Sequence, residues 1–383
     1  MAKKLELHLR PLKPAFQQPR RQLSDEFSLA CICFRFILSS LHNSSSLQTL
    51  LLSHVQVAPA HQRLILAIKT LRRLILQYSE FVPTSVTLPS SSITSLSLHG
   101  VEPAATAHVL TLLSNSIETL DCTTNIYHIL SNIRLPRLTS LWSLSYPEVN
   151  HLVALSAFMR LTSLTIGSCL NHCVLFPDIP PAVLPHLRHL CTSWDLGERL
   201  VIGRPVHTFS LIWEIRSFKN SQTRLVKDIS QFAAGASHLE ELQIPLTIPV
   251  RDTIEIISQY LPHITRLHLW TLPGNLPTPQ YTIPFQWIVV REHIFQHPSL
   301  KEVTVGFAPE NWKQAAYITR EAPGWSLSRP RCAHVFDVIV EKCPVVEVVR
   351  IGTSLPWIDA REVPREWVME WRKGESGEWV ERR

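Results

Sequence analysis

The residues of this chain that could carry catalytic or metal chemistry are its cysteines and histidines, and their spacing favours neither role. The sequence contains eight cysteines and 18 histidines. Cys31 and Cys33 lie close together, as do Cys169 and Cys173 with His172 between them. No C-x-x-C motif occurs, and no second half of a zinc site lies at a matching distance. We therefore interpret the thiols as structural and expect no metal site.

The motifs of common enzyme classes are absent from the sequence. It has no P-loop, dinucleotide fingerprint, nucleophile elbow or H-E-x-x-H motif. Only 11 glycines are present from which a phosphate-binding loop could be built. The histidines are scattered, and nothing in the pattern orients one of them as a general base. We predict a protein with no catalytic residues and no cofactor; a hydrolase or transferase site within residues 309–331 is the remaining enzymatic alternative.

A different pattern dominates the chain: L-x-x-L-x-L recurs about a dozen times. Its fourth and sixth positions are apolar and alternate with mostly polar neighbours, which is the period of a β-strand with one buried face. Segments with helical spacing separate the copies, at residues 59–71, 103–113, 148–161 and 252–261. Each repeat therefore predicts a strand, a turn and a helix, and neighbouring repeats must stack to bury their apolar sides. Clear copies start at Leu47, Leu71, Ile93, Ile117, Leu161, Leu239, Ile264, Leu300 and Val346.

These copies resemble the leucine-rich-repeat family, and more narrowly the irregular repeat region of fungal F-box proteins. Successive copies from Leu47 to Leu187 start 21 to 26 residues apart, within the family's range of about 20 to 29. The family consensus places Asn or Cys at the ninth position, where this chain has Asn125 and Cys169. The resemblance covers residues 47–354 and implies an α/β solenoid with parallel strands on a concave side and helices on a convex side. Spacings of 33, 25, 36 and 46 residues after Leu211 predict irregularity in the C-terminal half.

Four regions follow from this reading. Residues 1–26 form a basic N-terminal arm, which we interpret as solvated, and residues 27–46 form an N-terminal capping helix. Residues 47–356 form the irregular repeat solenoid, and residues 357–383 form a Trp-rich cap or tail. In that tail Val363, Trp367 and Trp371 lie four residues apart, which predicts a short helix with one apolar stripe. A terminal cap is the preferred interpretation, with a partner-docking helix as the alternative.

Charge and hydropathy limit the choice of partners. The net charge is +6, but no dense basic tract follows the N-terminal arm, so we do not expect nucleic acid as the partner. The apolar segment at residues 27–41 is shorter than the roughly 20 residues needed to cross a bilayer and contains Arg35. We expect no membrane association and a location in the cytoplasm or nucleus.

The third, fifth and seventh positions of each copy point away from the core and would line the concave sheet. This surface is polar, with tryptophans at positions where the pattern does not require apolar side chains. Exposed Trp and Arg often dominate binding energy. We hypothesise that a protein partner binds there; the alternative for Trp270 is burial beneath a loop at residues 273–284. The predicted partner-binding residues are Trp142, His189, Glu241, Arg266, His268 and Trp270.

The resemblance also implies a biological role. In F-box proteins an N-terminal box docks to the core of a ubiquitin ligase, and the repeats hold the target. Leu23, Asp25 and Glu26 match parts of the box's opening L-P-x-E, but Ser24 replaces the proline. The repeats also begin at Leu47, before a three-helix box could finish, so the box is absent or degenerate. We predict a protein-binding solenoid, with substrate recognition for a ubiquitin ligase as what the resemblance implies. The alternative is a generic leucine-rich-repeat scaffold unrelated to ubiquitin.

Overall fold

The structure is a computed structural model, and it describes residues 4–8, 37, 46–83, 91–143, 155–167, 179–211, 229–246, 256–271, 297–307, 329–353 and 368–382. The chain divides into two compact units, Met1–Leu187 and Arg188–Arg383. We call them the N-terminal and C-terminal units and describe each by itself.

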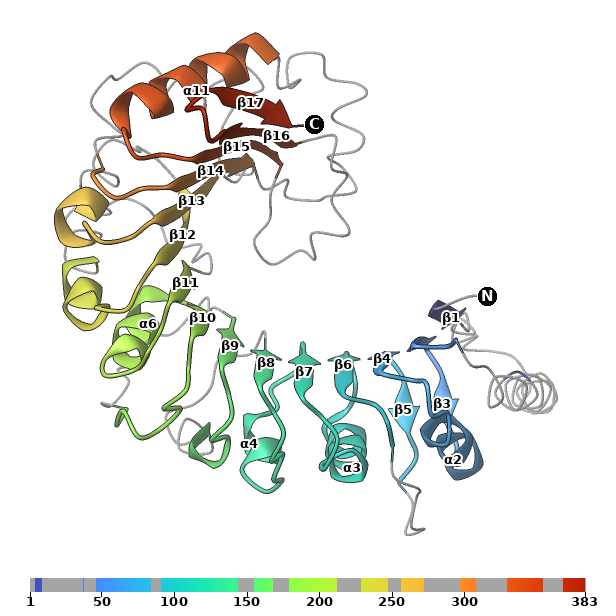
Figure 1. The fold of residues 1–383 in the computed structure, drawn as a ribbon. Coiled ribbons are helices and arrows are strands. Elements are labelled where there is room, and N and C mark those ends of the chain that lie inside the picture. The colour runs from blue at the N-terminus through green and yellow to red at the C-terminus, as the bar shows by residue number, and fades with distance from the viewer. Residues whose placement is uncertain are drawn as a thin grey trace, which may run out of the picture. The chain divides into compact units, whose positions relative to one another are not determined.

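The N-terminal unit is built on a parallel sheet whose strands follow chain order: β1 from the N-terminal arm, then one strand from each repeat (Figure 1). Short strands β3 (Gln56–Val57) and β5 (Glu80–Phe81) pair beside this sheet. The fourth positions of the repeats are register partners, running from Leu50 through Leu74 and onward to Leu164. The sheet contains β1 (Lys4–His8), β2 (Thr49–Ser53), β4 (Arg73–Gln77), β6 (Ser95–His99), β7 (Thr119–Cys122), β8 (Ser140–Ser143) and β9 (Ser163–Ile166).

Short helices cover one face of this sheet (Figure 1). Helices α2 (Pro59–Leu66) and α3 (Pro103–Leu112) both begin with proline, whose fixed φ suits the first helical turn. They confirm the helices expected at residues 59–71 and 103–113, although α2 ends five residues early. Helix α4 (Tyr127–Leu130) follows Asn125, whose Oδ1 accepts a hydrogen bond from the Tyr127 N–H at 3.2 Å. The described part of the segment expected at 148–161 contains only the 3₁₀ turn η1 (Leu155–Ala157).

The C-terminal unit continues the same construction. Helices α6 (Trp194–Val201) and α11 (Arg329–Lys342) lie on the side of the sheet that the apolar positions face. The register runs through Phe209, Leu242, Leu267, Val303 and Val349 without a shift. The parallel strands are β10 (His189–Thr192), β11 (Thr208–Leu211), β12 (Glu241–Leu246), β13 (Arg266–Thr271), β14 (Glu302–Phe307) and β15 (Val348–Thr353).

The apolar positions of the repeats form the core of each unit. The side chains at their first, fourth and sixth positions, from Leu47 to Ile351, are almost all fully buried. In the C-terminal unit Trp194 on α6 packs against Phe209 and Phe232, with ring centroids 5.3 Å apart in both pairs. The strand-turn-helix solenoid predicted from the repeats is therefore confirmed. The segments that lengthen the last two spacings, residues 272–296 and 308–328, lie outside the described residues.

The structure describes only residues 4–8 of the predicted N-terminal arm, and these correct the interpretation of the arm as solvated. Lys4–His8 forms β1, which pairs in parallel with β2 instead of extending into solvent. The reason is that Leu5 and Leu7 alternate with charged neighbours at the period of a strand, and the edge of β2 offers unpaired backbone groups. Residues 9–26 and, apart from Ile37 and Ser46, the capping helix expected at 27–46 lie outside the described residues.

The helix predicted to carry Trp371 is also wrong. Residues Val368–Lys373 form β16, and Trp379–Arg382 form β17. β16 pairs antiparallel with β15, and β17 pairs antiparallel with β16. The open edge of β15 explains the difference. Its unpaired backbone N–H and C=O groups can be satisfied by a neighbouring strand but not by a helix. Val363 and Trp367 lie outside the described residues.

Across the described ranges, no helix combines the length and the apolarity that a bilayer span requires.

Candidate functional site

The outward face of the C-terminal unit, opposite its buried core, carries two rows of mostly polar side chains. They arise because the third and fifth positions of each repeat alternate with the buried ones. Register pairing then aligns them across the strands. One row is Glu241, Arg266, Glu302, Val348 and Arg372, and the other is Gln243, His268, Thr304, Arg350 and Glu370. We call these ten residues the β12–β16 face.

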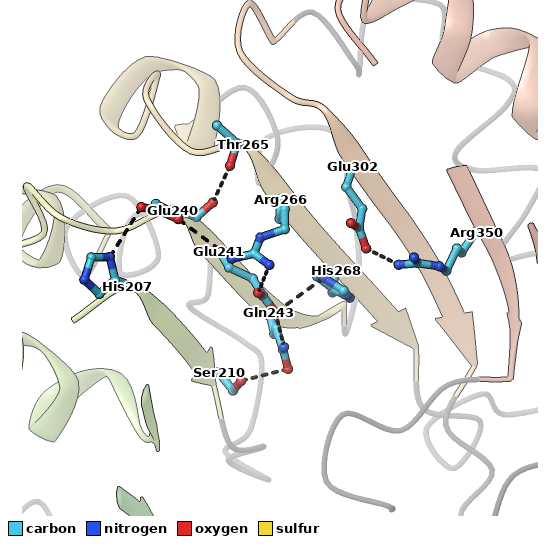
Figure 2. Close-up of polar contacts among 10 residues, drawn as sticks. All are labelled: His207, Ser210, Glu240, Glu241, Gln243, Thr265, Arg266, His268, Glu302 and Arg350. Atoms are coloured by element: carbon cyan, nitrogen blue, oxygen red, sulfur yellow. Dashed lines mark hydrogen bonds and ion pairs between the residues drawn. The ribbon is translucent and has the colours of Figure 1, made fainter. Parts of the chain in front are cut away.

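Glu241 is the centre of the first half of this face, which Figure 2 shows with its neighbours. Gln243 Nε2 donates a 2.6 Å hydrogen bond to Glu241 Oε1. Arg266 Nη1 lies 3.3 Å from Glu241 Oε2, and His268 Nε2 lies 3.5 Å from Glu241 Oε1. Ser210 Oγ donates a 2.7 Å hydrogen bond to Gln243 Oε1. One carboxylate thus gathers side chains from β12 and β13, and Gln243 extends the network to β11.

Glu240 extends the network along the edge of the face. It precedes β12, and its Oε1 lies 3.4 Å from His207 Nδ1 while its Oε2 lies 3.8 Å from Arg266 Nη2 (Figure 2). The side chain of Glu240 is 56% exposed, against 13% for Glu241. Its contacts are therefore screened by water and weaker than those of Glu241.

Arg350 organises the second half of the face. Its Nη1 donates to Glu302 Oε1, and its Nε donates a 2.7 Å hydrogen bond to Glu370 Oε2. Arg372 Nε donates to the other oxygen of Glu370. The Arg350 side chain is only 25% exposed, so one guanidinium joins strands β14, β15 and β16 in a partly desolvated setting.

The pKa values follow from burial and pairing. Burial lowers the pKa of His268 and outweighs the opposing effect of Glu241 and Glu302. Burial alone would lower the pKa of Arg350, but its hydrogen bond with Glu370 and the charge of Glu302 raise it. For Glu370, burial is outweighed by the hydrogen bonds from Arg372 and Arg350, and its pKa is lowered. The face therefore carries a neutral His268 together with an ionised Arg350 and Glu370 at neutral pH.

The outward face of the N-terminal unit carries a second polar group. Asp121 on β7 lies between Ser97 on β6 and Trp142 on β8 in the register of the sheet. His99 Nε2 lies 3.6 Å from Asp121 Oδ2. Burial raises the pKa of Asp121 and outweighs the opposing effects of His99 and a hydrogen bond with Ser97.

The structure brings together three of the predicted site residues. Glu241, Arg266 and His268 are in direct contact. His189 is exposed on β10, and its register partner Thr208 separates it from Glu241. Trp270 lies in β13, but its side chain is outside the described residues. Trp142 belongs to the other unit, so it is not part of the β12–β16 face.

The sequence analysis missed the second half of the face. The third and fifth positions of the copies starting at Leu300 and Val346 include Glu302 and Arg350, so the same rule would have found them if extended past Trp270. Glu370 and Arg372 could not be found in this way, because their segment was predicted to be a helix. Nothing in the repeat pattern indicates that the segment containing Glu370 and Arg372 adds antiparallel strands to the sheet.

Within the described part of the chain, no group of three or more His, Cys, Asp or Glu side chains could hold a metal ion.

No protein-family model and no curated protein sequence matches this chain. Among solved structures it is similar to the crystal structure of a TLR13–ssRNA13 complex, at 14% sequence identity and a TM-score of 0.40. The match covers 69% of this chain and 36% of that one, so this chain spans about a third of the length of that protein. A likeness this distant carries no information about what this chain binds.

Proposed function

We propose that this chain is a non-enzymatic repeat scaffold that binds a protein partner through the outward faces of its strands, with the β12–β16 face as one contact region. The observation that carries the proposal is the concentration of charge on that face. Three arginines and three glutamates from five consecutive strands meet there, on a sheet whose opposite face is apolar.

The charge balance of the face supports a protein partner over nucleic acid. The face carries as many positive as negative side chains: Arg266, Arg350 and Arg372 against Glu241, Glu302 and Glu370. Glu240 adds one further negative charge at the edge. A surface that binds a nucleic-acid backbone needs a clear excess of positive side chains, because contacts between Lys or Arg and the phosphates supply much of the affinity. Balanced charges of both signs instead give register and specificity in protein contacts.

Arg266 is the side chain of the face best placed to change partners. It is 41% exposed, and its distances to Glu241 and Glu240 are 3.3 and 3.8 Å. Such loose pairs contribute little to stability, whereas arginine is among the residues that most often dominate binding energy. Arg350, which is less exposed and joins two carboxylates, suits a structural role instead.

The more specific proposal is that the partner is a substrate of a ubiquitin ligase, for which this chain is the recognition subunit. The resemblance of the repeats to those of fungal F-box proteins supports it. A cytoplasmic or nuclear location belongs to the same proposal. The buried thiol of Cys122, which forms no disulfide, agrees with a reducing compartment. The alternative is a repeat scaffold with no connection to ubiquitin.

The test is affinity purification of the tagged full chain from its own cells, with co-purifying proteins identified by mass spectrometry. Arg266→Gln is compared with wild type and with Arg137→Gln, which alters an exposed pair with Glu118 outside the strands. We expect Arg266→Gln to reduce specific partners by about tenfold without lowering the melting temperature, and Arg137→Gln to retain them. Equal recovery from all three proteins would show that the face does not bind the partner.

The same experiment decides between the two roles. Recovery of a cullin and its adaptor with the wild-type chain would support the ligase proposal and make the other proteins candidate substrates. Recovery of specific partners without these components would contradict the ligase proposal and leave a binding scaffold.

A further inference from the structure

The outward face of the N-terminal unit contains a carboxylate that its own chain leaves incompletely satisfied. Asp121 Oδ1 is buried and accepts no hydrogen bond. His99 Nε2, at 3.6 Å from Oδ2, is beyond hydrogen-bond distance. The unpartnered Oδ1 makes the ionised carboxylate costly in the folded chain, and an opposite charge brought to the other oxygen, Oδ2, would lower that cost.

This carboxylate can still be reached from outside. The Asp121 side chain is 26% exposed, although its Oδ1 is covered. An incoming donor would therefore meet Oδ2 and would share it with His99. Ser97 cannot serve as an entry point, because it is 2% exposed.

An aromatic side chain lies directly beside the carboxylate. Trp142 is the register partner of Asp121 on β8, and it is half-buried on the same face. Neighbouring strands lie about 4.8 Å apart, so the side chains of register partners on one face are adjacent. A cation placed against an indole face is attracted by the ring, and more strongly when a carboxylate is adjacent.

We propose that Asp121 and Trp142 together receive a lysine or arginine side chain of a protein partner. The carboxylate supplies the opposite charge, and the indole covers the aliphatic part of the incoming side chain. The groups that face the pair from neighbouring strands are Arg73 on β4, Ser97 and His99 on β6, and Thr165 on β9. Arg73 is exposed, and its charge only partly offsets that of Asp121.

The cost of burying the Asp121 carboxylate indicates that this residue serves binding and does not stabilise the fold. Burial raises the pKa of Asp121, which means that the ionised carboxylate is held less favourably in the folded chain than in the unfolded one. Replacing it by Asn should therefore not reduce the melting temperature. A purely structural Asp121 would behave in the opposite way.

The experiment pans a displayed library of random dodecapeptides on the full chain and measures synthetic versions of enriched peptides by fluorescence anisotropy. We expect peptides that require one Lys or Arg, and about tenfold weaker binding to Asp121→Asn and to Trp142→Ala. A double-mutant cycle combines norleucine in place of the peptide's Lys or Arg with Asp121→Asn. If the two groups contact each other, the losses of binding free energy from the two single changes should not add up to the loss from both. Arg137→Gln, which alters an exposed pair with Glu118 outside the strands, is the control and should bind these peptides normally.

Several results would overturn the proposal. One is an additive cycle; another is the failure to find any peptide whose binding depends on Asp121. Peptides lost only with Arg266→Gln would contradict it while supporting the function proposed for the β12–β16 face. A single-stranded RNA dodecamer that binds in an Asp121-dependent manner, without such peptides, would reassign the pair to a nucleobase.

Discussion

At the scale of the residue, a buried arginine ends helix α6 in the C-terminal unit. Arg204 is 2% exposed, and its Nη1 donates to the backbone carbonyls of Arg199, Leu200 and Ile202 at 3.2, 3.3 and 3.1 Å. Carbonyls in the last turn of a helix lack partners within the helix, and a positive charge suits the negative end of its dipole. Burial lowers the pKa of Arg204 to about 10, so it remains charged at neutral pH.

Arg204→Met is expected to destabilise the protein by about 1–3 kcal/mol, because it keeps the length of the side chain but leaves buried carbonyls without a donor. Urea denaturation followed by circular dichroism measures this change. Arg199→Met, on the same helix but 35% exposed, should change the free energy of unfolding by less than about 1 kcal/mol. Similar values for the two variants would contradict the role of Arg204 as a helix cap.

At the scale of the element, the strands of the β12–β16 face are joined by charge as well as by backbone hydrogen bonds. Each outward position meets only its register partners and near neighbours, so opposite charges must alternate from strand to strand. Glu302, Arg350 and Glu370 follow this rule across β14, β15 and β16. Partial burial of these charged groups costs free energy, and their ion pairs offset that cost only while each charge retains an oppositely charged partner.

Arg350→Met should therefore destabilise the C-terminal unit by about 1–3 kcal/mol, because it leaves Glu302 and Glu370 partly buried without their shared cation. Arg372→Met is the matched change, since that side chain is 42% exposed and, among the described residues, pairs with one carboxylate, Glu370. We expect it to cost less than about 1 kcal/mol. Thermal denaturation of both variants gives the comparison, and an equal loss would mean that Arg350 does not join the strands.

The same face predicts a dependence on pH. Because burial lowers the pKa of His268, the unfolded chain binds more protons than the folded chain as the pH falls through 6.5. Stability attributable to this residue is present above that pH and is lost below it. The lowered pKa of Glu370 acts in the same direction, but only as the pH falls through 4.5 and below.

His268→Gln should consequently reduce the loss of stability between about pH 7 and 5 while leaving the loss at lower pH in place. The measurement is the free energy of unfolding from urea titrations at each pH. An unchanged pH profile in this window would show that His268 is not the responsible group.

At the scale of the whole molecule, the C-terminal strands end the parallel sheet of their unit. β16 satisfies the edge of β15, and Trp371 packs on Phe336 of α11 with ring centroids 4.9 Å apart. Trp379 of β17 meets the same ring at 5.1 Å. A repeat array needs its last apolar edge covered, and an uncovered strand edge can pair with another chain.

Deletion of residues 362–383 is expected to cause aggregation, because it uncovers β15 and Phe336 together. Size-exclusion chromatography with light scattering would detect it. A soluble, monomeric truncated chain would instead favour the alternative in which this segment docks to a partner. The point variant Trp371→Ala, which keeps the backbone pairing, should lower the melting temperature without comparable aggregation.

The sequence by itself determined the repeat unit and the side of each strand that is buried. Leu50, Leu74 and Leu242 could be placed in the core because burial follows the local period of two, which needs no knowledge of distant residues. The same period placed Glu241, Arg266 and His268 on the outward face, and it would have placed Glu302 and Arg350 there as well.

Only the tertiary structure decided how the ends are used and which polar side chains meet. Lys4–His8 and Val368–Lys373 became strands because the open edges of β2 and β15 offered backbone partners, and for the second segment this long-range condition outweighed the local helical spacing. Trp142 is not part of the β12–β16 face, because it lies on β8 of the N-terminal unit. Spacing along the chain predicts which face a residue occupies, but contacts between faces depend on register and on packing across repeats.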